Sequence, residues 1–316
     1  MTTSALHEWN SASPYNDYSN YVRRTFGARV QKVSINAGFT CPNRDGTKGV
    51  GGCAFCNNST FNPDYCNPEK TITQQIDEGI RFFAPKYKTM RYLAYFQAYS
   101  NTYGATDRVI ALYREALRHP LIEGLVIGTR PDCIAEDLLD ATAELAKRYY
   151  IAIELGAETR NDMILSQINR CHTWADALAA VDRIARRKLR VGLHFIMGLP
   201  GESVESQLST ADVVSSLPIE SVKLHQLQIV RGSQYAKQYA ETPELFTLWN
   251  SDDYIDFCVD FAERLSPNIV IERFVSQAPR ELVVAPQWDL KNYEFVHRLE
   301  RRFRERGTWQ GRLRAK

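Results

Sequence analysis

Six short apolar runs alternate with amphipathic segments along residues 30–230, and this alternation limits the chain to few folds. Runs with little charge are typical of strands buried on both faces of a parallel sheet, which need helical crossovers between them. We expect strands at residues 30–37, 92–97, 124–129, 150–155, 189–197 and 221–230. We expect helices at residues 72–87, 107–118, 135–148, 173–187 and 203–216. Because a closed barrel of this kind has eight units, six units predict an α/β fold with an open, partial (β/α)6 barrel.

Further elements are expected on both sides of this barrel. Residues 14–27 read as a short aromatic helix, and the segments after the barrel read as a helix, a strand and a helix at residues 252–265, 268–274 and 292–306. We therefore divide the chain into three parts. These are an N-terminal helical segment (1–29), the barrel core (30–232) and a short α/β C-terminal extension with a basic tail (233–316).

Composition limits the class of protein. Of 316 residues, 44% are hydrophobic and 24% charged, which is ordinary for a soluble globular protein. The first residues lack the apolar stretch of a secretion signal, and the longest apolar run, residues 191–199, is too short to span a bilayer. We expect a cytoplasmic protein without a membrane partner. Seven cysteines in such a protein favour metal ligation over disulfides.

Residues 37–60 contain the densest cluster of potential metal ligands. Cys41, Cys53 and Cys56 follow a C-x11-C-x2-C spacing in a glycine-rich loop directly after the first expected strand. Three thiolates can bind three irons of a [4Fe–4S] cluster and leave the fourth iron open, as a catalytic centre requires. The alternatives are a zinc site completed by Cys66, in a non-enzymatic zinc-binding module, and a set of unrelated structural thiols.

Polar or glycine-rich segments also follow four of the other expected strands. They lie at residues 97–102, 129–132, 154–158 and 198–202. In parallel α/β folds the carboxyl ends of the strands meet at one side of the sheet, where ligands bind. The sequence therefore predicts that these segments and the cysteine loop form one site.

The motifs in these segments together resemble a known family. The C-x11-C-x2-C loop, FQAYSNTY, GTRPD, ELGAE, NRCH and GLPGE occur in the order found in radical S-adenosylmethionine (SAM) enzymes of the YhcC/YtqA type, which are related to the catalytic subunit of Elongator. The resemblance covers residues 14–311. It implies a radical SAM barrel in which a [4Fe–4S] cluster reductively cleaves SAM to methionine and a 5′-deoxyadenosyl radical. It also implies an electron donor such as flavodoxin or ferredoxin.

The same resemblance implies roles for individual residues. Cys41, Cys53 and Cys56 would be the metal ligands, and the backbone of Phe55 would lie near the adenine of SAM. Glu154 is the best candidate for the SAM ribose, because a carboxylate accepts hydrogen bonds from both hydroxyls. Further candidates for SAM binding are Gln97, Thr129, Glu158, Arg170 and Met197.

Two residues depart from the family pattern. Glu158 stands where the family typically has glutamine, and Cys171 stands where glycine or alanine is usual. Cys171 is either a partner in the reaction or a small buried thiol. Lys223 and His225 alternate with apolar neighbours on the sixth strand, so both are candidates to point into the barrel and to act in catalysis.

The sequence leaves three alternatives open for what this chain acts on. The Elongator-like motifs and the tail favour a base in transfer RNA: residues 298–316 carry eight Lys or Arg, two Glu and Trp309. The alternatives are a small metabolite, or a role as one subunit of a larger assembly. The residues after 230 are too few for the acetyltransferase domain of Elongator's catalytic subunit, so its acetyl-transfer reaction is not expected here.

Overall fold

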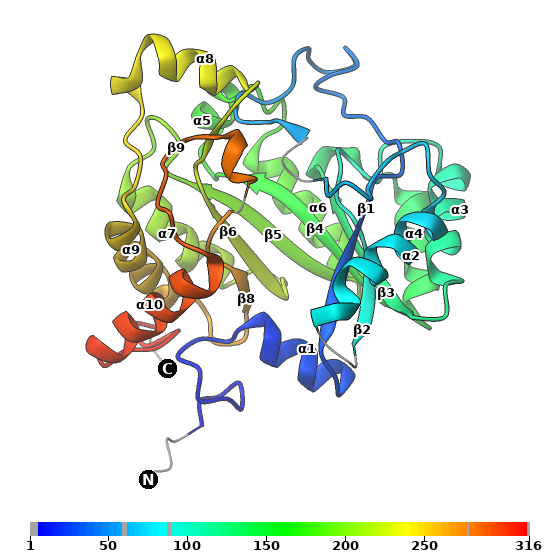
Figure 1. Ribbon diagram of the computed structural model, residues 1–316, viewed down its shortest axis with the longest axis horizontal. Coiled ribbons are helices and arrows are strands. Elements are labelled where there is room, and N and C mark those ends of the chain that lie inside the picture. The colour runs from blue at the N-terminus through cyan, green and yellow to red at the C-terminus, as the bar shows by residue number, and fades with distance from the viewer. Residues whose placement is uncertain (1–5, 59–61, 87–89, 277, 315–316) are drawn as a thin grey trace.

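The computed structural model describes residues 6–58, 62–86, 90–276 and 278–314. A seven-stranded parallel sheet with the strand order β1-β2-β3-β4-β5-β6-β8 forms its centre (Figure 1). Its strands are β1 Val30–Ile35, β2 Arg91–Phe96, β3 Ile122–Thr129, β4 Tyr150–Glu158, β5 Arg190–Met197, β6 Ser221–Gln226 and β8 Val270–Arg273. The first six are the predicted strands in the predicted order, and β8 adds a seventh. The predicted partial barrel is confirmed.

Helices cover the outside of the curved sheet in Figure 1. The crossover helices are α2 Ile72–Phe83, α3 Thr106–Leu117, α4 Glu136–Ala146, α6 Trp174–Arg186 and α7 Val204–Val214. Capping boxes fix the start of two of them. The hydroxyls of Thr71 and Thr173 each accept from the backbone N–H three residues on, and each threonine donates its own N–H to the side chain of that residue. Apolar stripes on these helices then pack against the sheet.

The two faces of the sheet differ in chemistry. Side chains that point outward, such as Ile35, Ile127 and Leu193, are fully buried against the helices. Because side chains alternate along a strand, His194, next to Leu193, points inward, and so does Lys32, which lies three positions before Ile35 on β1. The sheet thus has an apolar outer face and a largely polar inner face, and the inner face leads to the carboxyl ends of the strands.

The C-terminal extension is continuous with this core. Strand β8 pairs with β6, and the helices α9 Ser251–Arg264 and α10 Asn292–Glu305 pack against each other beside it (Figure 1). The N-terminal helix α1 Tyr18–Phe26 lies against β8. The two ends of the chain are bonded together, since Gln310 donates its backbone N–H to Pro14 and accepts from the N–H of Asn16.

Two expectations about element boundaries are wrong. The sixth strand was expected at residues 221–230 but ends at Gln226, and the chain then leaves the sheet as β7 Ile229–Val230, which pairs antiparallel with β9 Val283–Ala285. The first helix was expected from residue 14 but begins at Tyr18, because the Asp17 side chain accepts from the N–H of Asn20 and caps the helix there.

Two short helices were not expected from the sequence. They are α5 Asp162–Gln167 and α8 Gln234–Glu241. With six and eight residues, they are too short to show a helical period in the sequence. Helix α5 lies just before the NRCH motif, and the N–H of Arg170 bonds back to the carbonyl of Leu165 at 2.8 Å. This helix therefore positions a motif of the predicted site.

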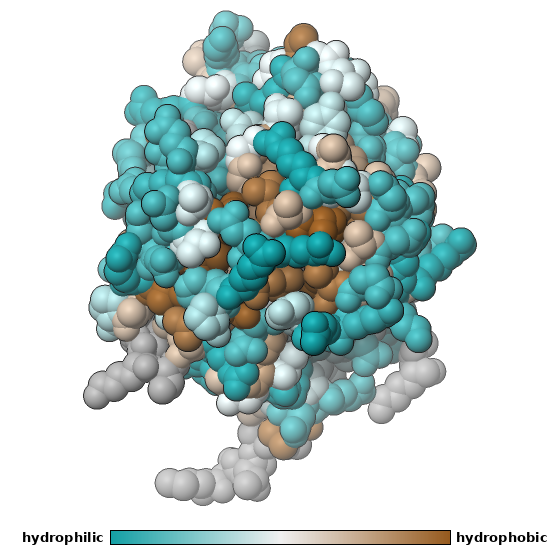
Figure 2. All heavy atoms as spheres, turned by 90° about the vertical axis from the view of Figure 1, so that its right-hand side faces the viewer, coloured by the Kyte–Doolittle hydropathy of each residue, from teal (hydrophilic) through white to brown (hydrophobic). Residues whose placement is uncertain are grey.

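The surface is mostly polar. Figure 2 shows the side at the right of Figure 1, where polar side chains surround a central group of apolar ones. Among the residues that the structure describes, no helix has the length and apolar character needed to cross a membrane.

Candidate active site

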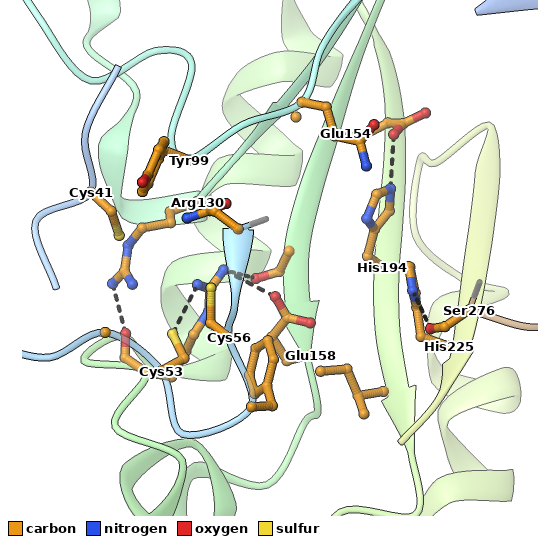
Figure 3. Close-up of a pocket in the computed structure, with 18 of the residues that line it drawn as sticks. Cys41, Cys53, Cys56, Tyr99, Arg130, Glu154, Glu158, His194, His225 and Ser276 are labelled. Carbon is orange, nitrogen blue, oxygen red and sulfur yellow. Dashed lines mark hydrogen bonds and ion pairs between the residues drawn. The ribbon is translucent and has the colours of Figure 1, made fainter. Parts of the chain in front are cut away.

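A cavity of about 1280 Å³, including its open mouth, lies at the carboxyl ends of the strands. Its wall comes from the cysteine loop after β1, from the ends of β2 to β6, and from the segment after β8. In Figure 3 the cysteines line one side of the cavity, and His225 and Ser276 line the opposite side. The predicted convergence of these segments is therefore observed.

Most of the predicted site residues line this one cavity. They are Cys41, Cys53, Phe55, Cys56, Gln97, Thr129, Glu154, Glu158, Arg170 and His225. Three others do not. Met197 is buried in the main hydrophobic core, Lys223 is buried beneath the cavity, and Cys171 is exposed outside it.

The cysteine loop folds into consecutive turns that aim its thiols at the cavity. Arg44 donates its N–H to the carbonyl of Cys41 at 2.8 Å, and Cys56 donates to that of Cys53 at 2.9 Å. Gly52 has φ = +83°, and a Cβ there would meet the Arg44 side chain at 2.9 Å. Glycine is therefore required where Arg44 crosses the loop.

The NRCH segment holds this loop from the other side. Asn169 donates its side-chain amide to the carbonyls of Val50 at 3.2 Å and Gly52 at 2.8 Å. Asn43 donates in the opposite direction, to the carbonyl of Asn169, and Ala54 donates its N–H to Ile168 at 3.0 Å. The NRCH segment thus fixes the geometry of the cysteine loop. The spacing of residues in the sequence did not reveal this role.

Two donors are directed at the sulfur of Cys53. The side-chain amide of Asn43 and the guanidinium of Arg170 each lie 3.5 Å from it. Donors and cations around a cysteine sulfur favour the thiolate, the form that ligates metal. Three thiols on one cavity wall, one of them hydrogen-bonded in this way, fit the ligand set of an iron–sulfur cluster.

Cys66 does not join these three cysteines. Its thiol donates to the carbonyl of Ser34 at 3.0 Å and packs in the main hydrophobic core, away from the cavity wall. The four-cysteine zinc site considered above is therefore not assembled. Among the described residues, no three His, Cys, Asp or Glu side chains are spaced to hold a single metal ion. A multi-iron cluster does not need that convergence, because each thiolate binds a different iron.

Arg170 links the cysteine wall to the end of β4. Its guanidinium lies 2.7 Å from the carbonyl of Gly156 and 3.2 Å from the Glu158 carboxylate, besides the contact with Cys53. Burial alone would lower the pKa of Arg170, but Cys53 and Glu158 raise it. The unusual carboxylate at position 158 is therefore a buried ion-pair partner of Arg170, and burial raises its own pKa.

Glu154 lies at the centre of a buried group of charges. Its carboxylate is 2.7 Å from the ammonium groups of both Lys32 and Lys223 and 2.9 Å from the ring of His194. Burial would raise the pKa of Glu154, but these three neighbours lower it well below its ordinary value. Glu272 also pairs with both lysines, so two carboxylates balance two ammonium groups here.

Strained backbone gathers around the cavity. Tyr99, Glu158, Asn169 and Cys171 all have positive φ, between +53° and +67°. Such angles favour glycine and cost other residues of order 1 kcal/mol or more, and they cluster at functional sites. The positive φ of Cys171 suits the glycine, and not the alanine, of the two residues expected at this position from the resemblance.

Several residues of the site were not predicted as functional. Arg130 is buried and pairs with Asp132 at 2.9 Å while donating to the carbonyl of Arg170 at 2.7 Å. Arg130 could have been predicted as a site residue from its place in the GTRPD motif. His194 was not among the predicted site residues, yet it lines the cavity. Arg273 also lines the cavity, and no motif marks it.

Comparisons with known proteins agree with this geometry. Residues 38–214 match the family model of the radical SAM superfamily, which is more than half of the chain. The chain belongs to the radical SAM superfamily. Residues 219–305 of this radical SAM protein also match the radical SAM C-terminal domain.

Relatives of similar length align with most of the chain. Protein YhcC of Escherichia coli (strain K12) is 34% identical over 93% of this chain and 93% of its own length. Protein YtqA of Bacillus subtilis (strain 168) is 31% identical over 96% of this chain and 94% of its own length. The expected relationship to proteins of the YhcC/YtqA type is confirmed.

More distant similarity extends to larger proteins. The solved structure of Elp3 from the archaeon Methanocaldococcus infernus has a TM-score of 0.68 at 14% identity, covering 89% of this chain and 64% of that chain. It shows the same fold. A tRNA uridine(34) acetyltransferase of Dehalococcoides mccartyi (strain CBDB1) is 24% identical over 54% of this chain and 37% of its own length.

Proposed function

We propose that this radical SAM protein binds a [4Fe–4S] cluster through Cys41, Cys53 and Cys56 and cleaves SAM beside it. The observation that carries the proposal is the convergence of the three thiols on one wall of the cavity, with family membership behind it. When bound and reduced by a donor such as flavodoxin or ferredoxin, the cluster supplies the electron that splits SAM into methionine and a 5′-deoxyadenosyl radical.

The residues of the chain act by binding, orienting and excluding water. Arg170 and Asn43 hold the Cys53 thiolate, and Arg170 is itself held by Glu158. Phe55, Gln97 and the other cavity residues named above are the proposed contacts of SAM. Glu154 remains the proposed ribose ligand: its two carboxylate oxygens offer about four acceptor positions, of which Lys32, Lys223 and His194 use three.

Metal content tests the ligand assignment. Anaerobically reconstituted protein is expected to contain four irons and four sulfides per chain, as the proposed cluster has. Cys53→Ala is expected to lose most of this iron, and Cys66→Ala is the matched control that should retain it. Wild-type protein that binds zinc without iron, or a Cys66→Ala variant that loses the cluster, would contradict the assignment.

A base in transfer RNA is one candidate for the acceptor, by which we mean the substrate molecule that the radical attacks. It is supported by the similarity to a tRNA uridine(34) acetyltransferase and by the fold shared with Elp3. The tail supports it less than its sequence suggested. Arg302 pairs with Asp256 of α9, and Arg306 lies 2.5 Å from Asp260, so part of the basic surplus is already neutralised.

Mass spectrometry of tRNA nucleosides from a deletion strain tests this candidate. A modified nucleoside that disappears in the deletion strain and returns with the wild-type gene, and not with the Cys53→Ala gene, would establish it. An unchanged nucleoside profile would exclude tRNA modification under the growth conditions used. A small metabolite is the second candidate, and it is favoured by the cationic inner end of the cavity described next.

A further inference from the structure

The end of the cavity away from the cysteines is lined by groups that bind anions. His194 of β5 and His225 of β6 lie with ring centroids 5.4 Å apart, and Ser276 lies 3.0 Å from a ring nitrogen of His225. Arg273, at the end of β8, brings its guanidinium to within 2.9 Å of the same ring. Figure 3 shows His225 and Ser276 across the cavity from the cysteines.

The charge of Arg273 is not matched by a carboxylate. Of the other arginines of the cavity wall, Arg130 pairs with Asp132 and Arg170 pairs with Glu158, whereas Arg44 donates to the carbonyl of Cys56 at the cysteine end. Within the described part of the chain, Arg273 forms no ion pair. Its Nε atom is buried there without a hydrogen-bond partner.

Neighbouring groups do not supply the missing negative charge. Burial, followed by the charge of Arg273, lowers the pKa of His225 well below its usual range, so this ring is neutral. Behind it, the carboxylates of Glu154 and Glu272 are used by two lysines. This end of the cavity therefore carries one uncompensated positive charge.

A guanidinium in this setting has a preferred ligand. Withdrawing a charge from water is costly unless it is paired, so a half-buried guanidinium that faces a cavity without an acidic partner favours an anionic ligand. Its planar fork matches a carboxylate or a phosphate, which accept two parallel hydrogen bonds. The Ser276 hydroxyl lies, like Arg273, at hydrogen-bond distance from Nδ1 of His225, and it offers a further polar group at this end of the cavity.

We propose that Arg273, assisted by Ser276, binds a carboxylate or phosphate group of a small acceptor molecule at the inner end of the cavity. This assignment of the acceptor rests on the proposed function, in which SAM occupies the cysteine end. The anion then anchors one end of the acceptor inside the barrel and leaves the rest facing the cysteine wall. The substrate class is a small organic acid or phosphate ester.

Simple anions can test the site without knowledge of the substrate. The protein is reconstituted with its cluster, saturated with SAM and titrated anaerobically with malonate, with inorganic phosphate and with the neutral probe malonamide. Calorimetry is expected to show binding of at least one of the two anions and none of malonamide. The anion that binds more tightly indicates whether the acceptor carries a carboxylate or a phosphate.

Variants assign the binding to Arg273. Arg273→Met is expected to weaken anion binding by about tenfold or more, because a charge-assisted pair is lost. Arg273→Lys keeps the charge but removes the planar fork, so its anion affinity is expected to lie between those of wild type and Arg273→Met. The matched control is Arg186→Gln, since Arg186 is exposed on α6 and pairs with Asp182. Melting temperature without anion, and iron content, verify that each variant is folded.

Three results would overturn the inference. They are equal anion affinity in Arg273→Met and wild type, equal binding of malonate and malonamide, and displacement of the bound anion by bulk tRNA. The yield of 5′-deoxyadenosine from SAM is measured on parallel samples of the same proteins that are reduced with dithionite and supplied with a cell extract containing the substrate. Anion binding that depends on Arg273 in a protein that does not cleave SAM would refute the proposed function and keep the anion site. SAM cleavage by a protein whose anion binding does not depend on Arg273 would keep the proposed function and refute the anion site.

Discussion

Glu154 shows how strongly the surroundings of a residue decide what it can do. From the sequence it was a strand-end carboxylate available to a ribose. In the structure it is almost completely buried and contacts Lys32, Lys223 and His194. Any hydrogen bond to SAM would be added to these contacts, so the residue has a structural role as well as the proposed binding role.

Replacing Glu154 by alanine should therefore destabilise the fold. Two buried ammonium groups would lose a partner, and breaking a buried pair in this way typically costs about 3–5 kcal/mol. The matched control is Glu136→Ala, because Glu136 pairs with arginines on the exposed surface and should cost less than about 1 kcal/mol. Denaturant unfolding of both variants measures the difference. Equal stability of Glu154→Ala and wild type would contradict the buried network.

His194 predicts how stability depends on pH. Burial, and then the charge of Lys223, lowers its pKa from 6.5 to about 4. The unfolded chain therefore takes up a proton at higher pH than the folded chain, so stability is full above pH 6.5 and falls as the pH drops towards 4. A single group of this kind contributes of order 3 kcal/mol across that window.

Unfolding measured between pH 7 and 4.5 checks this expectation. His194→Gln should show a smaller loss of stability over that range than wild type. His297→Gln, on the exposed surface of α10, should follow the wild-type curve. Identical pH profiles for His194→Gln and wild type would rule out His194 as the source of the slope.

A site residue could be predicted from the sequence when it belongs to a contiguous motif. The cysteines and Arg170 belong to contiguous motifs, and these were found. Arg273 has no motif, and only the pairing of β8 with β6 brings it to the cavity. Lys223 was expected to point into the barrel, and it does so, but Glu154 and Glu272 bind its ammonium group below the cavity.

At the scale of elements, the cysteine loop and the NRCH segment form one unit. Asn43 is fully buried and donates both to the sulfur of Cys53 and to the backbone of Asn169. Removing a donor next to a metal ligand typically lowers metal affinity by about 10–100-fold. We expect Asn43→Ala to lose iron to a chelator about tenfold faster than wild type.

A matched control separates this effect from a general loosening of the loop region. Asn67→Ala removes a side-chain amide whose oxygen accepts a hydrogen bond from the N–H of Glu69 in a turn outside the cavity. The rate of iron loss from this variant should therefore equal that of wild type. Equal rates for Asn43→Ala and wild type would mean that the hydrogen bond to the Cys53 sulfur does not stabilise the cluster.

The regular elements were predicted well where their signal was local. Apolar runs mark the strands because both faces of the sheet are covered along most of their length. The end of β6 was missed because residues 227–230 are as apolar as the strand itself. Only a tertiary contact reveals that break, namely the antiparallel pairing of β7 with β9. The ion pairs between α9 and α10 likewise depend on packing.

At the scale of the whole molecule, one curved sheet carries two chemically different ends of a single cavity. The cysteine end was predicted from spacing and resemblance, whereas of the cationic inner end only His225 was predicted, because its residues come from β5, β6, β8 and the segment after β8. The proposed division at residues 29 and 232 remains a prediction, and β8 of the C-terminal extension completes the sheet of the core.

The central claim is that this cavity cleaves SAM reductively at a cluster held by the three cysteines. The most direct measurement is the amount of 5′-deoxyadenosine formed from SAM by the anaerobically reconstituted, dithionite-reduced protein, in the presence of an extract that supplies the acceptor. We predict formation well above that of Cys53→Ala assayed in the same extract, while Cys66→Ala should equal wild type. If wild type and Cys53→Ala form the same amount, the cavity does not perform this reaction.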